Sequence, residues 1–210
     1  MINVTGKASR DDSHTKYVKI KKCTGRTKRT GVKPMNIPEP DSLDTVLAEL
    51  KAAVKKQPVK QQHILEEWLN IWSKYLIFEE TFNPKRLIYY KRGDIVLAHF
   101  GYNIGNELGG VHYAIVVENE NNISSGIVTV IPISSLDNGK TADDLHVSEV
   151  FLGKLIGDVN CYAMPLQIRS ISKLRIIKPK NKLHGKFTVP GSLLDSIDEK
   201  TRQLFTKNTT

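Results

Sequence analysis

The stretch that decides the fold is KRGDIVLAHFGYNIGNELGGVHYAIVVENENNISSGIVTVIPISS, residues 91–135. It holds three apolar runs whose β-branched and aromatic residues are typical of strands, at residues 94–100, 111–117 and 127–133. The glycine-rich residues 101–110 and the Asn- and Ser-rich residues 118–126 separate these runs and predict turns. Consecutive strands joined by such turns pair antiparallel. The sequence thus predicts three neighbouring antiparallel strands, with a glycine loop between the first two.

Short apolar runs predict further strands on the C-terminal side of this stretch. They lie at residues 146–150, 160–168 and 175–177, with turns at 153–157 and 170–173. Apolar side chains recur at helical spacing in three other segments, at residues 41–56, 58–80 and 192–206. The sequence therefore predicts a mainly β domain, with a small and strongly bent antiparallel sheet and a terminal helix, behind two N-terminal helices.

Several separated motifs resemble the MazF/PemK toxin family. They are RGDIV, a glycine loop that ends in ELGG, HYAIVV and TVIPISS, followed by QIRSISKLR at residues 167–175. The resemblance covers about residues 91–207. It implies a mainly β fold with helices, an SH3-like small barrel of the MazF/PemK/CcdB type, preceded here by an α-helical hairpin that short family members lack. It also implies a homodimer with an RNA groove across the dimer face.

The basic character of the chain is concentrated near its N-terminus. The net charge is +9, and residues 1–40 contain ten Lys and Arg against three Asp and Glu. Such an arm attracts polyanions without sequence discrimination, although a merely soluble leader has the same composition, and both interpretations stay open. We divide the chain into a basic flexible leader (1–40), a helical hairpin extension (41–82) and a MazF/PemK-like barrel domain with a C-terminal helix (83–210).

An aromatic stripe of Trp68, Trp72 and Tyr75 lies on the second predicted helix. At this spacing the three rings share one helix face. Such a stripe is more often a packing face than a platform for stacking bases. We expect it to bury against the first helix, the barrel or a second subunit.

Composition and motifs indicate a cytoplasmic protein without a cofactor. No apolar run is long enough to cross a bilayer, and the N-terminus lacks the apolar core of a signal peptide, so we expect no membrane contact. Cys23 and Cys161 lie in unlike contexts, which predicts two reduced thiols. The sequence shows no HExxH, paired-cysteine motif or acidic cluster with ligand spacing, so we expect no metal and no other cofactor.

The resemblance implies cleavage of single-stranded RNA without metal. The ribose 2′-OH attacks the adjacent phosphate, which requires a base, an acid for the leaving 5′-oxygen, and donors to the phosphoryl oxygens. In the family an arginine after the glycine loop and a threonine ending the third strand carry catalysis, and here His112 and Ser134 hold those places. Serine keeps the hydroxyl donor. Histidine loses the guanidinium fork but titrates near neutrality, so it can act as base or acid.

Arg169 occupies the position of the arginine in the family's QIR motif. The resemblance implies that it binds phosphate or stabilises the transition state, and the alternative is a surface or structural ion pair. Gln167 is a candidate base reader. One branch of the family uses an Arg-x-Asp pair just before this arginine, but Met164 and Leu166 stand there. That branch also has a histidine in the glycine loop, matched here by Asn106, so its acid/base arrangement is not carried over.

Four other residues are candidate RNA contacts. The resemblance makes the glycine loop a mobile flap over the RNA groove, with Asn103 and Glu107 as base readers; hydrogen bonds within the loop are the alternative for each. Lys91 and Arg92 can touch backbone phosphate, although a solvated start of a strand explains them equally.

The resulting expectation is the toxin of a type II toxin–antitoxin pair. It would be a metal-independent, sequence-selective endoribonuclease acting on mRNA or other single-stranded RNA, leaving 2′,3′-cyclic phosphate and 5′-OH ends, and a cognate antitoxin protein would block it. The alternative is a catalytically inactive nucleic-acid-binding module, or a poison of a protein target like the gyrase-binding relatives of this fold. In that case His112 would be a strand histidine bonded to backbone.

Overall fold

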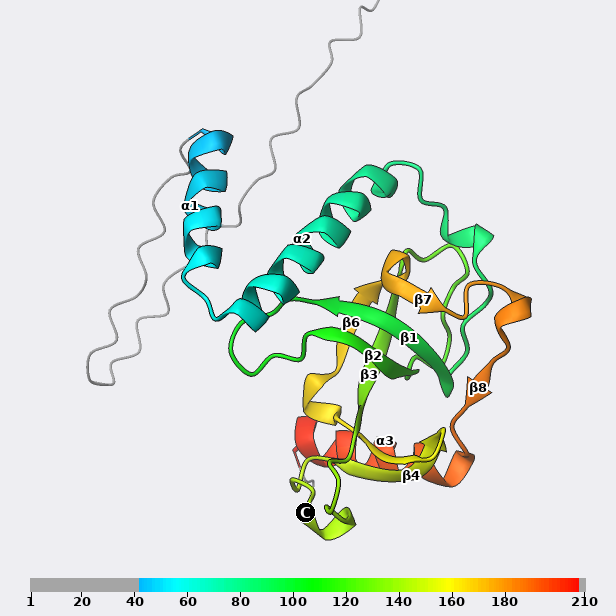
Figure 1. Cartoon of the computed structure of the whole chain (residues 1–210). Helices are drawn as coiled ribbons and strands as arrows, with labels where there is room; N and C mark the ends of the chain where they lie inside the picture. The colour runs from blue at the N-terminus through cyan, green and yellow to red at the C-terminus, as the bar shows by residue number, and fades with distance from the viewer. Residues whose placement is uncertain (1–41, 208–210) are drawn as a thin grey trace, which may run out of the picture. The chain divides into compact units, whose positions relative to one another are not determined.

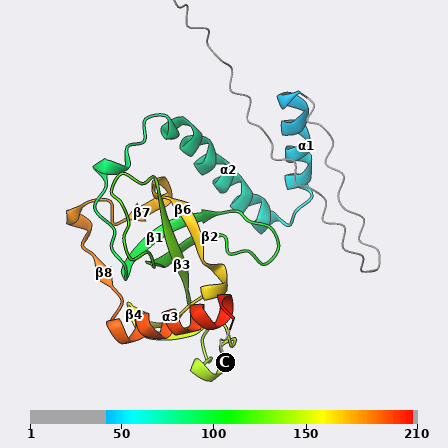
Figure 2. The same cartoon turned by 180° about the vertical axis from the view of Figure 1, so that it is seen from behind.

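The computed structural model describes residues 42–207, so the predicted leader at residues 1–40 lies outside the described residues. The described chain forms an antiparallel β domain behind two N-terminal helices, as the sequence predicts (Figures 1 and 2). The helices are α1 (Leu43–Lys55), α2 (Val59–Glu79) and α3 (Gly191–Phe205). The strands are β1 (Asp94–Gly101), β2 (Gly110–Val116), β3 (Ile127–Ser135), β4 (Val150–Ile156), β5 (Val159–Ala163), β6 (Arg169–Ser172), β7 (Ile176–Lys178) and β8 (Phe187–Thr188).

The sheet has the strand order β4-β5-β3-β2-β1-β7, with β6 paired to β3 and β8 paired to β1. Strand β3 belongs to both parts of the sheet. Its first residues pair with β6, its middle with β2, and its last three residues with β5. It therefore runs from the side of the domain that holds β6 to the side that holds β4 and α3 (Figures 1 and 2).

Two hydrophobic clusters lie on opposite faces of the central strands. In β1, Val96, Ala98 and Phe100 point into one cluster, while Ile95 points into the other, which α3 closes with Ile197. Neighbouring strand residues point to opposite faces, and here both faces are covered. This two-sided burial explains why β1 to β3 are nearly unbroken apolar runs rather than alternating ones.

The structure corrects three local predictions. Residues 146–149 form a turn, closed by a hydrogen bond of 2.9 Å from the His146 N–H to the Glu149 carboxylate, and the strand begins only at Val150. Of the turn predicted at 153–157, residues 153–156 lie inside β4, because Gly153 (φ +65°) is absorbed as a register shift against β5, and the turn itself begins at Gly157. The turn predicted at 170–173 is mostly strand β6, which pairs with β3.

The N-terminal helices occupy the predicted segments, and α2 contacts the β domain through Trp68. This ring stacks on His99 with 4.8 Å between centroids, and the guanidinium carbon of Arg175 lies 5.4 Å from its centroid. Tyr75 meets Trp68 edge-on, whereas Trp72 is 46% exposed. The aromatic stripe thus packs on the β domain through two of its three rings.

The helices of the described chain are too short or too polar to span a membrane. None of those in residues 42–207 combines the length and the apolar character needed to cross a bilayer.

Replacing Trp68 with alanine should weaken the attachment of α2. Trp68→Ala removes the ring between His99 and Arg175. We expect the free energy of unfolding to fall by about 2 kcal/mol, which is less than the loss for a fully buried tryptophan because this ring is partly exposed. The measurement is urea unfolding followed by circular dichroism. Trp72→Ala, the matched control at an exposed position, should cost less than about 1 kcal/mol. Equal losses in the two variants would contradict this role of Trp68.

The stability should also fall in mild acid because of His99. Burial lowers the pKa of His99 below its ordinary value of 6.5, and the charge of Arg175 acts in the same direction, while Glu67 opposes it. The neutral ring also accepts a hydrogen bond of 3.1 Å from the Gly101 N–H at Nδ1. The unfolded chain therefore takes up the proton first, so stability is complete above about pH 6.5 and is lost as the pH falls toward the folded pKa.

The measurement is the free energy of unfolding in urea between about pH 7.5 and 5.5. His99→Gln keeps an acceptor for Gly101 but cannot titrate, so its stability should vary less over this range than that of the unaltered chain. An identical pH dependence in both proteins would show that other groups cause it.

Candidate active site

A cleft of about 360 Å³ opens between β2, β3 and the β4–β5 hairpin. It contains both residues that the motifs single out, His112 and Ser134, although 21 residues separate them in the chain. The full lining is Leu97, Val111, His112, Tyr113, Ile133, Ser134, Ser135, Ile156, Val159 and Cys161.

The cleft arises where β2 and β3 separate. Their ladder ends with Ala114 opposite Pro132, and from Ile133 onward β3 pairs with β5 instead. Because proline has no N–H, Pro132 cannot donate a ladder hydrogen bond at this point. Continuing the β2–β3 register by two residues would place His112 opposite Ser134. The strands diverge before they reach that pair, so the two residues line an open cleft.

A backbone contact fixes the ring of His112. Its Nδ1 lies 3.3 Å from the carbonyl oxygen of Ile133, the residue before Ser134. A carbonyl can only accept, so Nδ1 carries the hydrogen and Nε2 is the unprotonated nitrogen of the neutral ring. The ring also meets Phe100 edge-on, with 6.3 Å between centroids. The backbone hydrogen bond of a structural histidine is thus present, and it leaves Nε2 available for proton transfer.

The hydroxyl of Ser134 is free to interact with a bound molecule. The side chain is partly exposed, and within residues 42–207 no hydrogen bond to its Oγ is formed. Its backbone is held by the pairing with Tyr162 of β5. Ser134 therefore offers a donor on a rigid strand, beside the carbonyl that orients His112.

Arg169 lies outside the cleft lining but close to it. Its guanidinium carbon is 5.3 Å from the centroid of Phe100, the ring that His112 also contacts. Its Nη2 donates to the Leu108 carbonyl at 3.2 Å and to Gln167 Oε1 at 3.1 Å. Burial lowers the pKa of Arg169 from its usual value, but arginine stays charged at neutral pH. The structure thus places this cation one ring away from His112.

The glycine loop is tied down by amide side chains. Asn103 Nδ2 donates to the carbonyls of Leu108 at 2.5 Å and Phe100 at 3.3 Å. Gln167 Oε1 accepts from the Leu108 N–H at 3.2 Å, and its Nε2 donates to the Asn106 carbonyl at 3.1 Å. Two of the three candidate base readers, Asn103 and Gln167, therefore make hydrogen bonds with the loop backbone in this structure.

Two glycines let the ends of this loop approach each other and α2. A Cβ on Gly109 would lie 2.7 Å from the carbonyl oxygen of Gly101, so only glycine fits. Gly101 has φ +92°, and a Cβ there would lie 2.9 Å from Trp68. Next to this contact, Gln61 Nε2 of α2 donates to the Tyr102 hydroxyl at 2.9 Å. The N-terminal extension thus contacts the first residues of the loop.

None of the five predicted RNA contacts lines the cleft: Asn103 and Gln167 bind the loop backbone, and the other three lie elsewhere. Lys91 lines a different cavity, beyond the start of β1. The guanidinium of Arg92 bonds the Asp198 carboxylate of α3. Glu107 is exposed in the glycine loop. Their roles stay predictions.

Sequence reasoning did not single out two residues of the site, one in the cleft lining and one in the core behind it. Tyr113 is 39% exposed on its wall, and Phe100 connects His112 with Arg169. In the sequence both are ordinary strand residues, and only the inclusion of Tyr113 in the HYAIVV motif was a signal for the site. Cys161 is a free, buried thiol in the wall; burial raises its pKa, so it stays protonated at neutral pH.

Residues 42–207 contain no group of three or more His, Cys, Asp or Glu side chains able to hold a metal ion.

The chain has similar proteins among the solved structures. No curated protein matches the chain significantly. It is similar to the crystal structure of MazF from Deinococcus radiodurans, with 19% identity and a TM-score of 0.37 over 56% of this chain and 96% of that one. The toxin MazF-mt6 of Mycobacterium tuberculosis gives 14% identity and a TM-score of 0.38, over 53% and 95%. The crystal structure of MazE–MazF from D. radiodurans gives 18% identity and a TM-score of 0.36, over 56% of this chain and 96% of that one.

The family assignment comes from residues 91–205. This span matches the family described as PemK-like, MazF-like toxins of type II toxin–antitoxin systems, and it is more than half of the 210 residues. It includes the strands that form the cleft, together with His112, Ser134 and Arg169. The chain therefore belongs to the PemK-like, MazF-like toxin family of type II toxin–antitoxin systems.

Proposed function

We propose that this toxin is a metal-independent, sequence-selective endoribonuclease that cleaves single-stranded RNA such as mRNA. The 2′-OH of one nucleotide attacks its own 3′-phosphate, and the products carry a 2′,3′-cyclic phosphate and a 5′-OH. One observation carries the proposal: the Ile133 carbonyl holds His112 Nδ1, which leaves Nε2 as the unprotonated nitrogen of the neutral ring in the cleft that Ser134 lines.

His112 is the proposed proton-transfer group. Neutral Nε2 takes the proton of the 2′-OH, or the imidazolium gives a proton to the leaving 5′-oxygen. The Nδ1–H···O bond to Ile133 suits both steps, because it persists in the neutral and the charged ring and stabilises the charged form. An arginine in this place, as in the family motif, cannot exchange protons at neutral pH.

Ser134 and Arg169 are the proposed stabilisers of negative charge. The Ser134 hydroxyl has no hydrogen-bond partner in the described part of the chain, so it can donate to a phosphoryl oxygen without breaking an existing bond. Arg169 contributes its positive charge from beside Phe100 and connects the site to the glycine loop.

RNA recognition is proposed to involve the glycine loop and the start of β1. Exposed Glu107 is the loop residue best placed to meet a base, whereas Asn103 and Gln167 act mainly by shaping the loop. Lys91 and Arg92 are the phosphate contacts proposed at the start of β1, although Arg92 must share its guanidinium with Asp198.

The proposed assembly follows from family membership. We propose a homodimer in the cytoplasm, with a cognate antitoxin protein that binds it and blocks access to RNA. The domain division into leader, helical extension and barrel domain is part of the same proposal.

A second candidate function is an RNA-binding module without catalytic activity. The observation that favours it is the composition of the cleft, whose lining includes no Lys or Arg. Charge on the phosphorane would then be met only by His112, hydroxyl groups and the more distant Arg169. In this case the chain holds RNA but does not cut it.

Substituting the two cleft residues should remove cleavage. We expect His112→Ala to lower kcat by about 100- to 10,000-fold, as for loss of a general acid or base. Ser134→Ala should lower kcat by about 100-fold or more, because one donor to the phosphoryl oxygen is lost. The assay incubates purified protein with mixed-sequence single-stranded RNA in EDTA and maps the fragment ends.

The matched controls are His63→Ala on α2 and Ser196→Ala on α3, which are exposed and lie outside the cleft. Both should cut like the unaltered chain, at a recurring short motif with cyclic-phosphate ends. Full activity in His112→Ala would show that its assigned role is wrong. RNA binding without any cutting by the unaltered chain would favour the second candidate.

A further inference from the structure

A second cavity, of about 610 Å³, lies beyond the start of β1 and away from the cleft. Two segments distant in the sequence form it: residues 86–91, which lead into β1, and residues 180–186, which follow β7. Its lining residues are Arg86, Leu87, Ile88, Tyr89, Lys91, Lys180, Asn181, Lys182 and Lys186. Five of these nine are Lys or Arg, and none is acidic.

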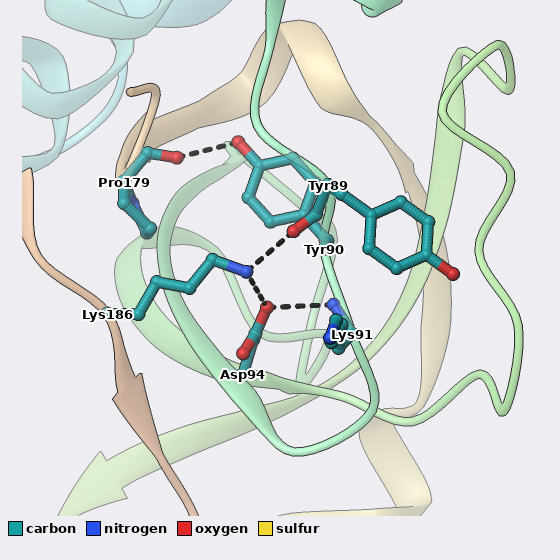
Figure 3. A network of polar contacts seen from close by, with 6 residues as sticks. All are labelled: Tyr89, Tyr90, Lys91, Asp94, Pro179 and Lys186. Atoms are coloured by element: carbon teal, nitrogen blue, oxygen red, sulfur yellow. Dashed lines mark hydrogen bonds and ion pairs between the residues drawn. The ribbon is translucent and has the colours of Figure 1, made fainter. Parts of the chain in front are cut away.

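A buried carboxylate connects the two segments. Asp94 is 3% exposed, and its Oδ2 accepts hydrogen bonds from the Lys91 N–H at 2.8 Å and from Lys186 Nζ at 2.6 Å (Figure 3). Lys186 Nζ also donates to the Tyr89 carbonyl at 2.6 Å. Beside this contact the Tyr90 hydroxyl donates to the Pro179 carbonyl at 2.7 Å (Figure 3). These bonds fix the backbone on both sides of the cavity.

The turn that carries two of the lysines is also ordered by its own hydrogen bonds. Asn181 Oδ1 accepts from the Leu183 N–H at 3.0 Å and caps the short helical turn at Lys182–His184. His184 Nδ1 accepts from the Lys180 N–H at 3.0 Å. The side chains of Lys180 and Lys182 therefore project from a defined backbone.

The positive charge of this cavity is largely uncompensated. Lys186 pairs with Asp94. Within residues 42–207, no ion pair involves the other four cations of the cavity, which are Arg86, Lys91, Lys180 and Lys182. Four like charges around one hollow repel each other, so their arrangement favours an anionic ligand with several charges.

We propose that this cavity binds the sugar-phosphate backbone of single-stranded RNA, as a second contact outside the cleavage cleft. The choice of RNA as ligand rests on the proposed function. Lysines from two fixed segments supply spaced partners for successive phosphates. The Tyr89 ring, 40% exposed among them, supplies a face on which a base can stack. Cationic groups combined with an exposed aromatic ring are the usual elements of a site for single strands.

The position of the cavity makes this contact dependent on RNA length. Strand β1 begins at Asp94 beside the cavity, and its Ala98 pairs with His112. Four strand residues at about 3.3 Å each separate the two sites by at least about 13 Å. An RNA that only fills the cleft does not reach the lysines, whereas a longer strand contacts both.

The test measures affinity of the full chain for 2′-O-methyl RNA, which has no 2′-OH and cannot be cleaved by the proposed reaction. Two lengths are used: about 2 nucleotides, which at about 3.4 Å per nucleotide are too short to span the two sites, and about 25 nucleotides, which are long enough to contact both. Lys180→Ala/Lys182→Ala should weaken binding of the long RNA about tenfold and lower the slope of log Kd against log salt by about 1.4, at 0.7 per lost phosphate contact. Binding of the short RNA should not change.

Two variants separate this effect from a general loss of charge. Lys51→Ala/Lys207→Ala removes two exposed lysines that line none of the cavities described above, and it should leave both affinities unchanged. Lys180→Arg/Lys182→Arg should retain the affinity of the unaltered chain for long RNA. Equal binding of long RNA by the alanine variant and the unaltered chain would overturn the proposal.

An acidic polypeptide is the other ligand that such a cavity can hold. If the alanine variant keeps its RNA affinity but loses affinity for polyglutamate, the cavity takes an acidic partner and the RNA proposal is wrong. Because the probe cannot be cleaved, the result does not depend on catalysis. A chain that cuts no RNA at all would refute the proposed endoribonuclease, while the affinity difference would still decide the role of the cavity.

Discussion

The structure depends on the burial of β1, β2 and β3 on both faces. Their side chains alternate between two hydrophobic clusters, one that includes Tyr90 and one closed by α3, so both faces are buried along β1, the last three residues of β2 and the middle of β3. This constraint fixes the register, because a slip by one residue would exchange the contents of the two clusters. The polar groups of the candidate site can lie only where this double layer ends.

The cleft lies where this double layer ends, and its geometry results from a change in the pairing partner of β3. Strand β3 leaves β2 after Pro132 and continues with β5. The Ile133 carbonyl accepts from His112 at this point, where the β2 ladder has ended. The same divergence exposes Ser134 on the opposite wall. Backbone topology, rather than a side-chain network, therefore orients the group proposed to move protons.

Helix α2 and the segments around the basic cavity contact the two opposite ends of strand β1. Helix α2 places Trp68 against Gly101 and Gln61 against Tyr102, at the start of the glycine loop whose other end is held by Gln167 and Arg169. At the opposite end of β1, the Asp94 hydrogen bonds gather lysines from two distant segments. One strand thus connects the loop beside the cleft with the basic cavity.

The sequence by itself determined the elements that local pattern controls. The runs of β1 to β3, the three helices, and His112 and Ser134 as candidate residues all follow from periodicity, turn residues and motif order. Tertiary structure alone decided that residues 169–172 are a strand, that Gly153 lies within one, that Asn103 and Gln167 bind the loop backbone, and that Lys180 and Lys182 face Lys91. The physical reason is that these features depend on hydrogen bonds and packing between segments far apart in the chain, which no local pattern records.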